Sequence, residues 1–470
     1  MRLPAAATGA LFYGLSLALA KGVSLLLMPW VAAHLAPAEY GRLEIVSTTL
    51  EFVGLVLSFG LGDTLFRFAG VSSGPDEQRQ RAALIAGAAL VLAAGCATLL
   101  QLAAPLVRAV LPIPVSEGVF RLCLLAVAAG GLIELPLAWL RLCERPKHFL
   151  AFMALRAALQ LVLVASFVAL FADAEAVLAA SAISELVLAA SLTLLQMRTS
   201  GFAFSLESWG WLRAYSLPLL VSGLAAFALG SCDRWFLAGQ VPVADIGRYA
   251  IAGKLALASA LLMQPFGMWW YAIRLRVLAG PDGLRRSADS VALGFAVLAG
   301  AAATIAIGGP AFIRLALPES YHGAASFVPW LVLASVMNES ASLLNVGVYA
   351  RRTAWRVAAV NGAGAVTALA AYAVLIPRAG VDGAIAATLI AQAVRIVGFL
   401  WAGRVDAPVP YRVTSMAVAA LGGLSIVLLA QAIEPPLGQA ALAVLVPALF
   451  VGLALGLGLV RPLMPREAAP

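Results

Sequence analysis

Apolar runs of roughly 20 residues follow one another along the whole chain, and no other feature constrains the fold as strongly. A helix of about 20 apolar residues spans the ~30 Å hydrocarbon core of a bilayer. Only 11% of the residues are charged, against about 25% in a soluble protein. The segments between the runs are too short for a soluble domain. The sequence therefore predicts an all-α, polytopic membrane protein.

The apolar runs predict about fourteen transmembrane helices. They lie near residues 7–33, 43–69, 82–107, 119–142, 149–171, 175–197, 212–238, 246–272, 289–313, 324–349, 354–376, 381–402, 411–432 and 437–461. An even number of spans places both termini on the same side of the membrane.

The basic residues predict the orientation. With the N-terminus inside, about 21 Lys and Arg face the cytoplasm and about 7 face outward, as the positive-inside rule requires. Both termini are then cytoplasmic. Attraction to the anionic heads of membrane lipids accounts for the net charge of +8, so no nucleic-acid partner is indicated.

One short pattern occurs twice, each time between two apolar runs. Glu39-Tyr40-Gly41-Arg42 lies between the first and second runs, and Asp245-Ile246-Gly247-Arg248 lies between the seventh and eighth. Both copies fall on the outer side, so the repeat is parallel rather than inverted. Two halves of one orientation are related by an axis along the membrane normal, which is typical of transporters with the substrate path between the halves.

The repeat predicts three parts of the chain. They are a six-helix N-terminal lobe at 1–200, a six-helix C-terminal lobe at 201–405, and two additional transmembrane helices at 406–470.

Signatures of enzymes and cofactor sites are missing from the sequence. It contains no P-loop and no GxSxG. Its four cysteines form no CxxC, and its three histidines are far apart, so neither a disulfide framework nor a metal site is indicated. We therefore expect no catalytic residues, no cofactor and no metal.

Polar residues inside the apolar runs are the candidate site residues, because an ionisable group in hydrocarbon is costly and usually faces a bundle interior or a wet cavity. The candidates for lining a substrate cavity are Lys21, Thr48, Glu51, Lys254, Gln392 and Arg395. The candidates for coupling or gating are Glu44, Asp63, Arg67 and Glu339.

The balance of these charges predicts a cationic central cavity. The offset of the repeat places Thr48 of the first half opposite Lys254 of the second. Lysine and arginine inside the spans suit an anionic substrate such as a phosphate or pyrophosphate head group. The alternative is that these charges pair between helices, Lys21 with Glu51 and Arg395 with Glu339.

The residues also resemble a known family. The stretches that carry the resemblance are LAPAEYG at 35–41, CDRWFL at 232–237, IGRYA at 246–250 and VDGAIAAT at 381–388. They are similar to the polysaccharide or O-antigen flippases of Wzx type, within the multidrug/oligosaccharidyl-lipid/polysaccharide exporter superfamily. The Asp-rich signature of the lipid II flippase branch is not found here.

The resemblance implies a function. Such proteins move an undecaprenyl-pyrophosphate-linked oligosaccharide to the outer leaflet of the bacterial inner membrane, by alternating access of two lobes. The glycan serves O-antigen, capsule or exopolysaccharide synthesis. Glycan polymerase and chain-length proteins are the implied protein partners.

Two other functions stay open at this stage. One is an ion-coupled drug or cation antiporter on the same scaffold, which Glu44 and Glu51 favour. The other is a membrane partner of a glycan-synthesis complex that transports nothing itself.

Overall fold

The computed structural model describes residues 5–58, 60–72, 74–350, 355–433 and 435–459. Within these ranges the side chains of 5–11, 13, 17, 18, 20, 21, 206–208 and 211–218 are not described. The side chain of Lys21 and both chain termini, whose orientation the sequence predicts, therefore lie outside the described residues.

The residues group into two compact units, Met1–Phe227 and Ala228–Pro470. The lobe boundaries predicted from the repeat stay a prediction. Within the described residues both units are helical, and the β-structure is one isolated bridge between Ala238 and Val241.

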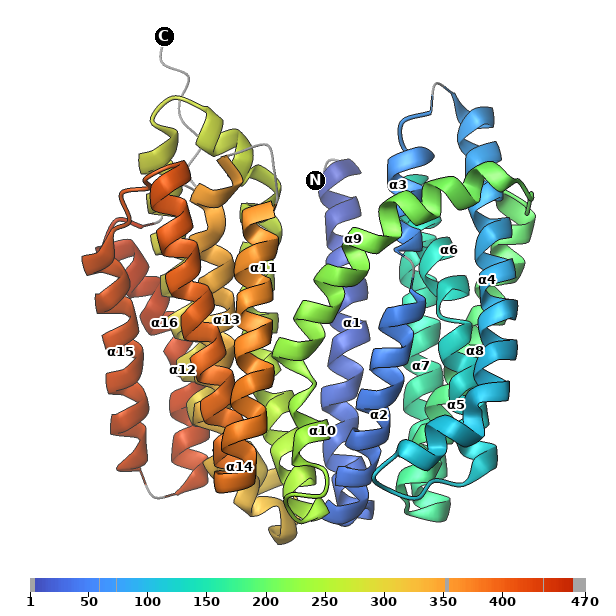
Figure 1. The fold of residues 1–470 in the computed structure, drawn as a ribbon. Coiled ribbons are helices and arrows are strands. Elements are labelled where there is room, and N and C mark those ends of the chain that lie inside the picture. Colours follow the sequence, from blue (N-terminus) through green and yellow to red (C-terminus); the bar gives the residue numbers. More distant parts are fainter. Residues whose placement is uncertain (1–4, 59, 73, 351–354, 434, 460–470) are drawn as a thin grey trace. The chain divides into compact units, whose positions relative to one another are not determined.

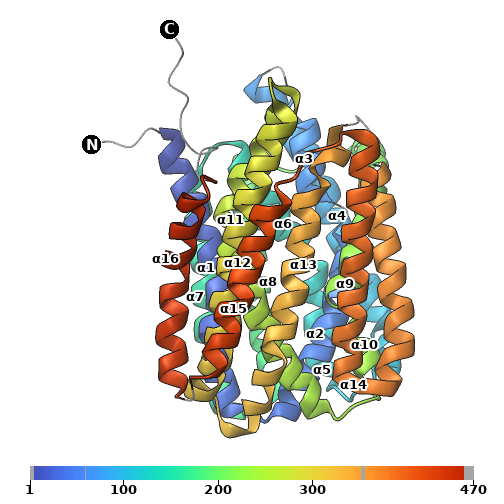
Figure 2. The same cartoon turned by 90° about the vertical axis from the view of Figure 1, so that its left-hand side faces the viewer.

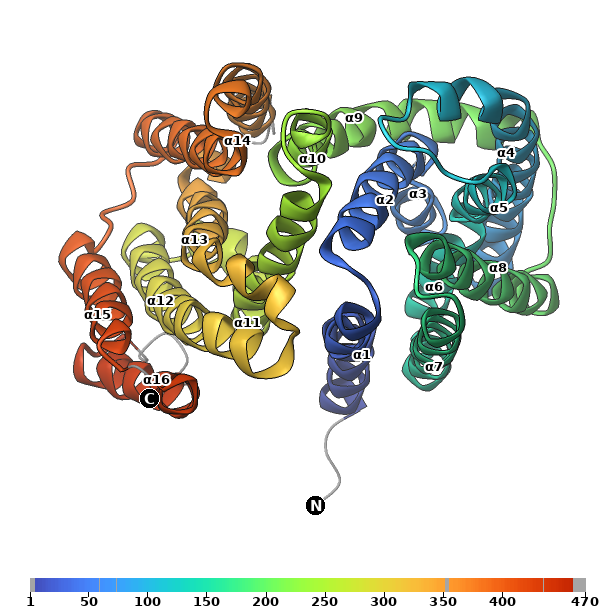
Figure 3. The same cartoon turned by 90° about the horizontal axis from the view of Figure 1, so that it is seen from below.

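Among its described residues the first unit has nine helices, the last of which ends just beyond the boundary of the unit. They are α1 (Ala5–His34), α2 (Pro37–Leu57), α3 (Leu61–Phe68), α4 (Pro75–Val110), α5 (Glu117–Ala128), α6 (Gly131–Leu142), α7 (Pro146–Phe171), α8 (Ala174–Thr199) and α9 (Leu206–Gly230). Figure 1 shows the ribbon. Helices α1 and α7 lie side by side, as the end-on view shows (Figure 3).

The second unit contains seven α-helices and two 3₁₀ helices. They are α10 (Asp233–Leu237), α11 (Val243–Ala279), α12 (Gly283–Ala316), η1 (Glu319–Ser326), α13 (Val328–Leu344), η2 (Asn345–Ala350), α14 (Trp355–Asp406), α15 (Val413–Gln431) and α16 (Pro436–Gly456). Helices α15 and α16 run along α12 (Figures 2 and 3).

The predicted spans are recovered as helices. In the part of the chain that the structure describes, eleven helical segments are long and apolar enough to cross a membrane, and Gly22–His34 and Leu219–Gly230 are shorter apolar helices. The 52-residue α14 holds two predicted spans, since the backbone leaves helical geometry inside it at Gly380, with φ 54° and ψ −126°. Glycine adopts this left-handed conformation without the steric cost of a Cβ. The prediction of an all-α polytopic membrane fold is thereby confirmed.

Small residues let α12 approach its neighbours closely. A Cβ added to Gly300 would lie 2.9 Å from Phe450 Cβ, and one added to Gly308 would lie 3.2 Å from Ala443 Cβ. Helices in a bilayer associate mainly through such close van der Waals packing. The two additional C-terminal helices are therefore an integral part of the second unit.

The two copies of the repeated pattern form the same local structure. Each begins a helix, and in each the arginine pairs with the acid three residues earlier, with Arg42 Nη1 3.1 Å from Glu39 Oε1 and Arg248 Nη1 2.7 Å from Asp245 Oδ1. An acid in the first turn favours the helix N-terminus electrostatically. The repeat thus encodes one helix-entry geometry twice.

Candidate functional site

Arg395 of α14 is buried within the second unit and is 7% exposed. Its Nε donates to Asn361 Oδ1 at 3.0 Å. Its Nη1 donates to Asn338 Oδ1 at 2.7 Å and to Gln392 Oε1 at 2.5 Å. The three acceptors are neutral side-chain amides, and we call Asn338, Asn361 and Gln392 the amide cradle.

Local sequence explains how the cradle forms. Gln392 precedes Arg395 by three residues, a spacing that places both on one helix face. Gly364 lies across from the arginine, on the part of α14 that precedes its kink. A Cβ at Gly364 would overlap Arg395 Cγ and lie 2.8 Å from Cδ. The glycine therefore leaves the space that the stem of Arg395 occupies.

Glu339 contacts the amide cradle through the side-chain amide of Asn338. Asn338 Nδ2 donates to Glu339 Oε1 at 3.5 Å while its Oδ1 accepts from Arg395. Asn338 thus bridges Arg395 and Glu339, the two residues considered as an ion pair from the sequence. On α11, Lys254 is half-buried.

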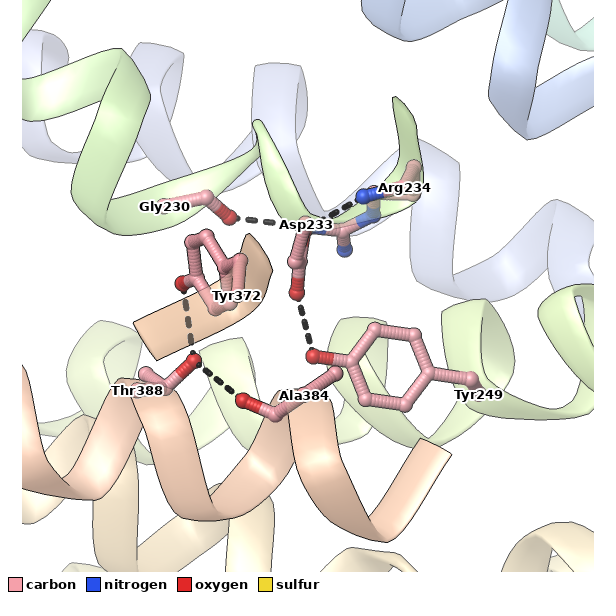
Figure 4. Close-up of polar contacts among 7 residues, drawn as sticks. All are labelled: Gly230, Asp233, Arg234, Tyr249, Tyr372, Ala384 and Thr388. Carbon is pink, nitrogen blue, oxygen red and sulfur yellow. Dashed lines mark hydrogen bonds and ion pairs between the residues drawn. The ribbon is translucent and has the colours of Figure 1, made fainter. Parts of the chain in front are cut away.

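A second polar cluster surrounds Asp233, the first residue of the short helix α10 (Figure 4). Asp233 is 3% exposed. Its Oδ1 lies 2.8 Å from Arg234 Nη1, and its Oδ2 accepts a hydrogen bond from the hydroxyl of Tyr249 in α11. The guanidinium of Arg234 also lies 5.5 Å from the centre of the Tyr249 ring. The carboxylate is therefore held by both a cation and a phenol.

Two further hydroxyl groups lie beside this cluster. Tyr372 and Thr388, on the two parts of α14, join their hydroxyls at 2.9 Å, and Thr388 Oγ1 donates to Ala384 O at 3.0 Å (Figure 4). The sequence places Thr388, Gln392 and Arg395 on one helix face. The structure divides that face between two clusters, with Thr388 in one and the other two residues in the cradle.

The candidate residues of the first unit lie on α2 and α3. Glu44 and Thr48 are buried, at 9% and 4% exposure, whereas Glu51 is exposed. Asp63 and Arg67 are exposed on α3, which begins at Leu61 after α2 ends at Leu57. The two helices together form one candidate membrane span, Pro37–Phe68, over the run that the sequence predicts as a span at 43–69.

An ion pair inside the first unit involves another intramembrane acid. Arg156 Nη2 of α7 lies 2.6 Å from Glu185 Oε1 of α8. One turn away, Gln160 Nε2 donates to Ser181 Oγ at 3.2 Å. These polar pairs join α7 to α8.

Three members of the two clusters were not identified from the sequence. Asn361 is one amide in an apolar run, and Tyr249 and Tyr372 look like ordinary membrane aromatics. Their partners are 34, 16 and 16 residues away. The polarity of Asn361 inside a span was the one available signal, because a buried amide requires a partner.

Neither cluster is a metal site by composition. Among the residues that the structure describes, no group of three or more His, Cys, Asp and Glu side chains could hold a metal ion.

The helices and the buried polar clusters inside them define a multi-pass membrane protein with a transporter fold. Its helices superpose on a lipid II flippase MurJ in an inward closed conformation with a TM-score of 0.74, at 10% identity over 97% of this chain and 100% of that one. A MATE family transporter in an inward-facing conformation gives 0.56, at 16% identity over 86% and 95% of the two chains. A MATE transporter in complex with MaD3S gives 0.55, at 16% identity over 88% and 96%.

The sequence identifies the family within this fold. The model of the family described as polysaccharide biosynthesis protein matches residues 6–271, more than half of the chain. The chain belongs to this family of flippases within the multidrug/oligosaccharidyl-lipid/polysaccharide exporter superfamily. No curated protein sequence matches it.

Proposed function

We propose that the protein flips an undecaprenyl-pyrophosphate-linked oligosaccharide from the cytoplasmic to the outer leaflet of the bacterial inner membrane. The glycan unit would serve O-antigen, capsule or exopolysaccharide synthesis. The observation that carries the proposal is Arg395, a buried guanidinium held by neutral amides inside a transmembrane helix of a polysaccharide biosynthesis family member.

The chemistry of the substrate suits the proposed cations. A lipid-linked pyrophosphate presents several anionic oxygens that must cross a low-dielectric region. Arginine binds phosphate oxygens with a planar fork, and lysine provides a compact charge. In the proposal Arg395, Lys254 and Lys21 attract the pyrophosphate, while Thr48, Gln392 and Glu51 complete the polar surroundings. Glu44, Asp63, Arg67 and Glu339 remain the candidates for coupling or gating.

Alternating access follows from the internal repeat in this proposal. Two halves of like orientation expose the site first to one side of the membrane and then to the other. The transport path is then complete within one chain, and polymerase and chain-length proteins would take over the product outside.

The test is to locate the lipid-linked intermediate in cells that lack the gene. We expect the complete undecaprenyl-linked oligosaccharide to accumulate in the cytoplasmic leaflet and the surface glycan to be lost. Wild-type protein should restore export. The Arg395→Ala and Lys254→Ala variants should restore about a tenth of it or less at equal membrane abundance, since each loses a charge-assisted contact.

An unchanged lipid-linked pool in these cells would contradict the flippase. If sensitivity to cationic drugs changed as well, the antiporter would replace it. If the purified protein moved no lipid-linked substrate in vesicles although export required the gene, the protein would be a partner of the synthesis complex and not its transporter.

The proposed orientation has its own test. In a cysteine-free background, we expect a membrane-impermeant maleimide to label Gln240→Cys in intact cells. His148→Cys should react only after permeabilisation. Both positions are exposed in the structure. Both lie between spans predicted from the sequence, on opposite predicted sides, and His148 lies in the first turn of α7. Labelling of His148→Cys in intact cells would show that the protein is inserted the other way.

A further inference from the structure

The hydrogen-bond partners of Arg395 are unusual for a buried arginine. Charged side chains are almost never fully buried unless they are paired. Arg395 is 7% exposed, and its Nε and Nη1 point to three amide oxygens. Nη2 donates to no acceptor among the residues that the structure describes. Neutral groups thus accept three of the five guanidinium hydrogen bonds, and the Nη2 donors remain.

We propose that the amide cradle positions Arg395 for an anionic oxygen of the substrate without cancelling its charge. An amide oxygen accepts a hydrogen bond as a carboxylate does, but it brings no counter-charge. The guanidinium is therefore held in place, and none of its three hydrogen-bond acceptors carries a counter-charge. Asn338, Asn361 and Gln392 are then positioning residues. This inference rests on the proposed function, and the anion that Arg395 binds is the diphosphate group of the substrate.

Glu339 explains why Asn338 presents its oxygen to the arginine. An ionised carboxylate only accepts hydrogen bonds, so the Asn338 NH₂ group turns toward Glu339 Oε1. The amide oxygen then faces Arg395 Nη1 at 2.7 Å. Asn338 thus contacts Glu339 through its amide nitrogen and Arg395 through its amide oxygen.

The packing around the aliphatic part of the Arg395 side chain also fixes its position. A Cβ at Gly364 would overlap Arg395 Cγ, whereas a Cβ at Gly362, two residues earlier in the same helix, would meet nothing within 4 Å. Gly364→Ala should therefore push Arg395 out of the cradle, and Gly362→Ala is its matched control.

The experiment measures binding of a short-chain prenyl diphosphate to the purified full chain in detergent, together with the thermal unfolding midpoint. The variants are Asn361→Asp, Gln392→Glu and Gly364→Ala, with Gly362→Ala as the control. The corresponding prenol, which carries no phosphate, controls for the lipid tail. Inorganic pyrophosphate tests whether the anion alone is recognised.

We expect Asn361→Asp and Gln392→Glu to bind the prenyl diphosphate about tenfold more weakly or worse, because each puts a counter-charge on the guanidinium. Their midpoints should be unchanged or higher, since a charged acceptor strengthens the existing hydrogen bond. Gly364→Ala should also bind weakly, and the Gly362→Ala control should bind as the wild type does. If the cradle only stabilised the fold, the acidic variants would keep wild-type binding and still gain stability.

Wild-type binding that Asn361→Asp and Gln392→Glu both preserve would overturn the role of the cradle while leaving the proposed function intact. If one acidic variant fails to fold, the other and the Gly364→Ala and Gly362→Ala pair decide the matter. Wild-type protein that does not bind the prenyl diphosphate would overturn the proposed lipid substrate and the cradle's role with it. Equally tight binding of inorganic pyrophosphate would overturn the lipid substrate but support the cradle as the site of the diphosphate.

Discussion

Replacing Asp233 with alanine should remove most of the folded protein from the membrane. The substitution leaves Arg234 and Tyr249 without the carboxylate that both of them contact. Removing one partner of a buried ion pair costs about 3–5 kcal/mol, because the remaining charge loses its counter-charge. Set against a total stability of about 5–15 kcal/mol, this loss is large.

The cluster geometry indicates why the effect is concentrated at Asp233. Helix α10 has only five residues, so it cannot hold its position through its own backbone bonds. Asp233 ties it to α11 through Tyr249 (Figure 4). Tyr249→Phe removes one hydrogen bond and keeps the ion pair, so it should cost only about 1–2 kcal/mol.

The measurement is the thermal unfolding midpoint of detergent-purified protein, with membrane abundance as a second readout. Asp233→Ala should lower the midpoint by about 10 °C. Asp289→Ala is the matched control, because Asp289 pairs with Arg412 at 3.4 Å with both side chains about 40% exposed. Such a pair contributes about 0–1 kcal/mol. Equal midpoints for the two variants would show that the Asp233 cluster does not hold α10.

Gly87→Ala should destabilise the first unit through the segment that joins α8 to α9. Ala203 N in that segment donates to Ala83 O of α4 at 2.9 Å. A Cβ at Gly87 would overlap Ala203 O and lie 2.8 Å from its carbonyl carbon. Because the obstacle is backbone rather than a flexible side chain, the whole segment must move. We expect a loss of about 3 kcal/mol, the upper end of the usual cost of overpacking.

Gly95→Ala in the same helix is the control. A Cβ there would meet nothing within 4 Å, and alanine favours a helix over glycine by up to about 1 kcal/mol. Gly95→Ala should therefore unfold at the wild-type temperature or above. Limited proteolysis between α8 and α9 should be faster in Gly87→Ala alone, since a released segment is open to cleavage. A Gly87→Ala protein as stable and as protease-resistant as the control would show that this contact does not anchor the segment.

Most of the helical architecture could be predicted because the bilayer leaves little choice. Inside hydrocarbon every backbone N–H and C=O must be satisfied within the protein, and a helix does so locally. The runs of apolar residues therefore marked the helices. Hydropathy alone could not show that the run at 43–69 is divided between α2, which ends at Leu57, and α3, which begins at Leu61.

The candidate site was predicted only in part. Helical spacing correctly grouped Gln392 with Arg395, since residues three apart share a face. It could not show that Asn338 and Asn361, 57 and 34 residues away, complete the shell. Nor could it show that Thr388 turns to Tyr372 instead.

The sequence by itself therefore determined that the chain crosses the membrane many times as helices, which residues are polar within them, and that one helix-entry pattern occurs twice. These properties depend on local composition, the thickness of the bilayer and short-range geometry. Only the tertiary structure decided which polar residues meet, because partners distant in sequence are chosen by how helices pack and where glycine leaves room. At Arg395 that choice supplied three neutral amides, and at Asp233 an arginine and a phenol.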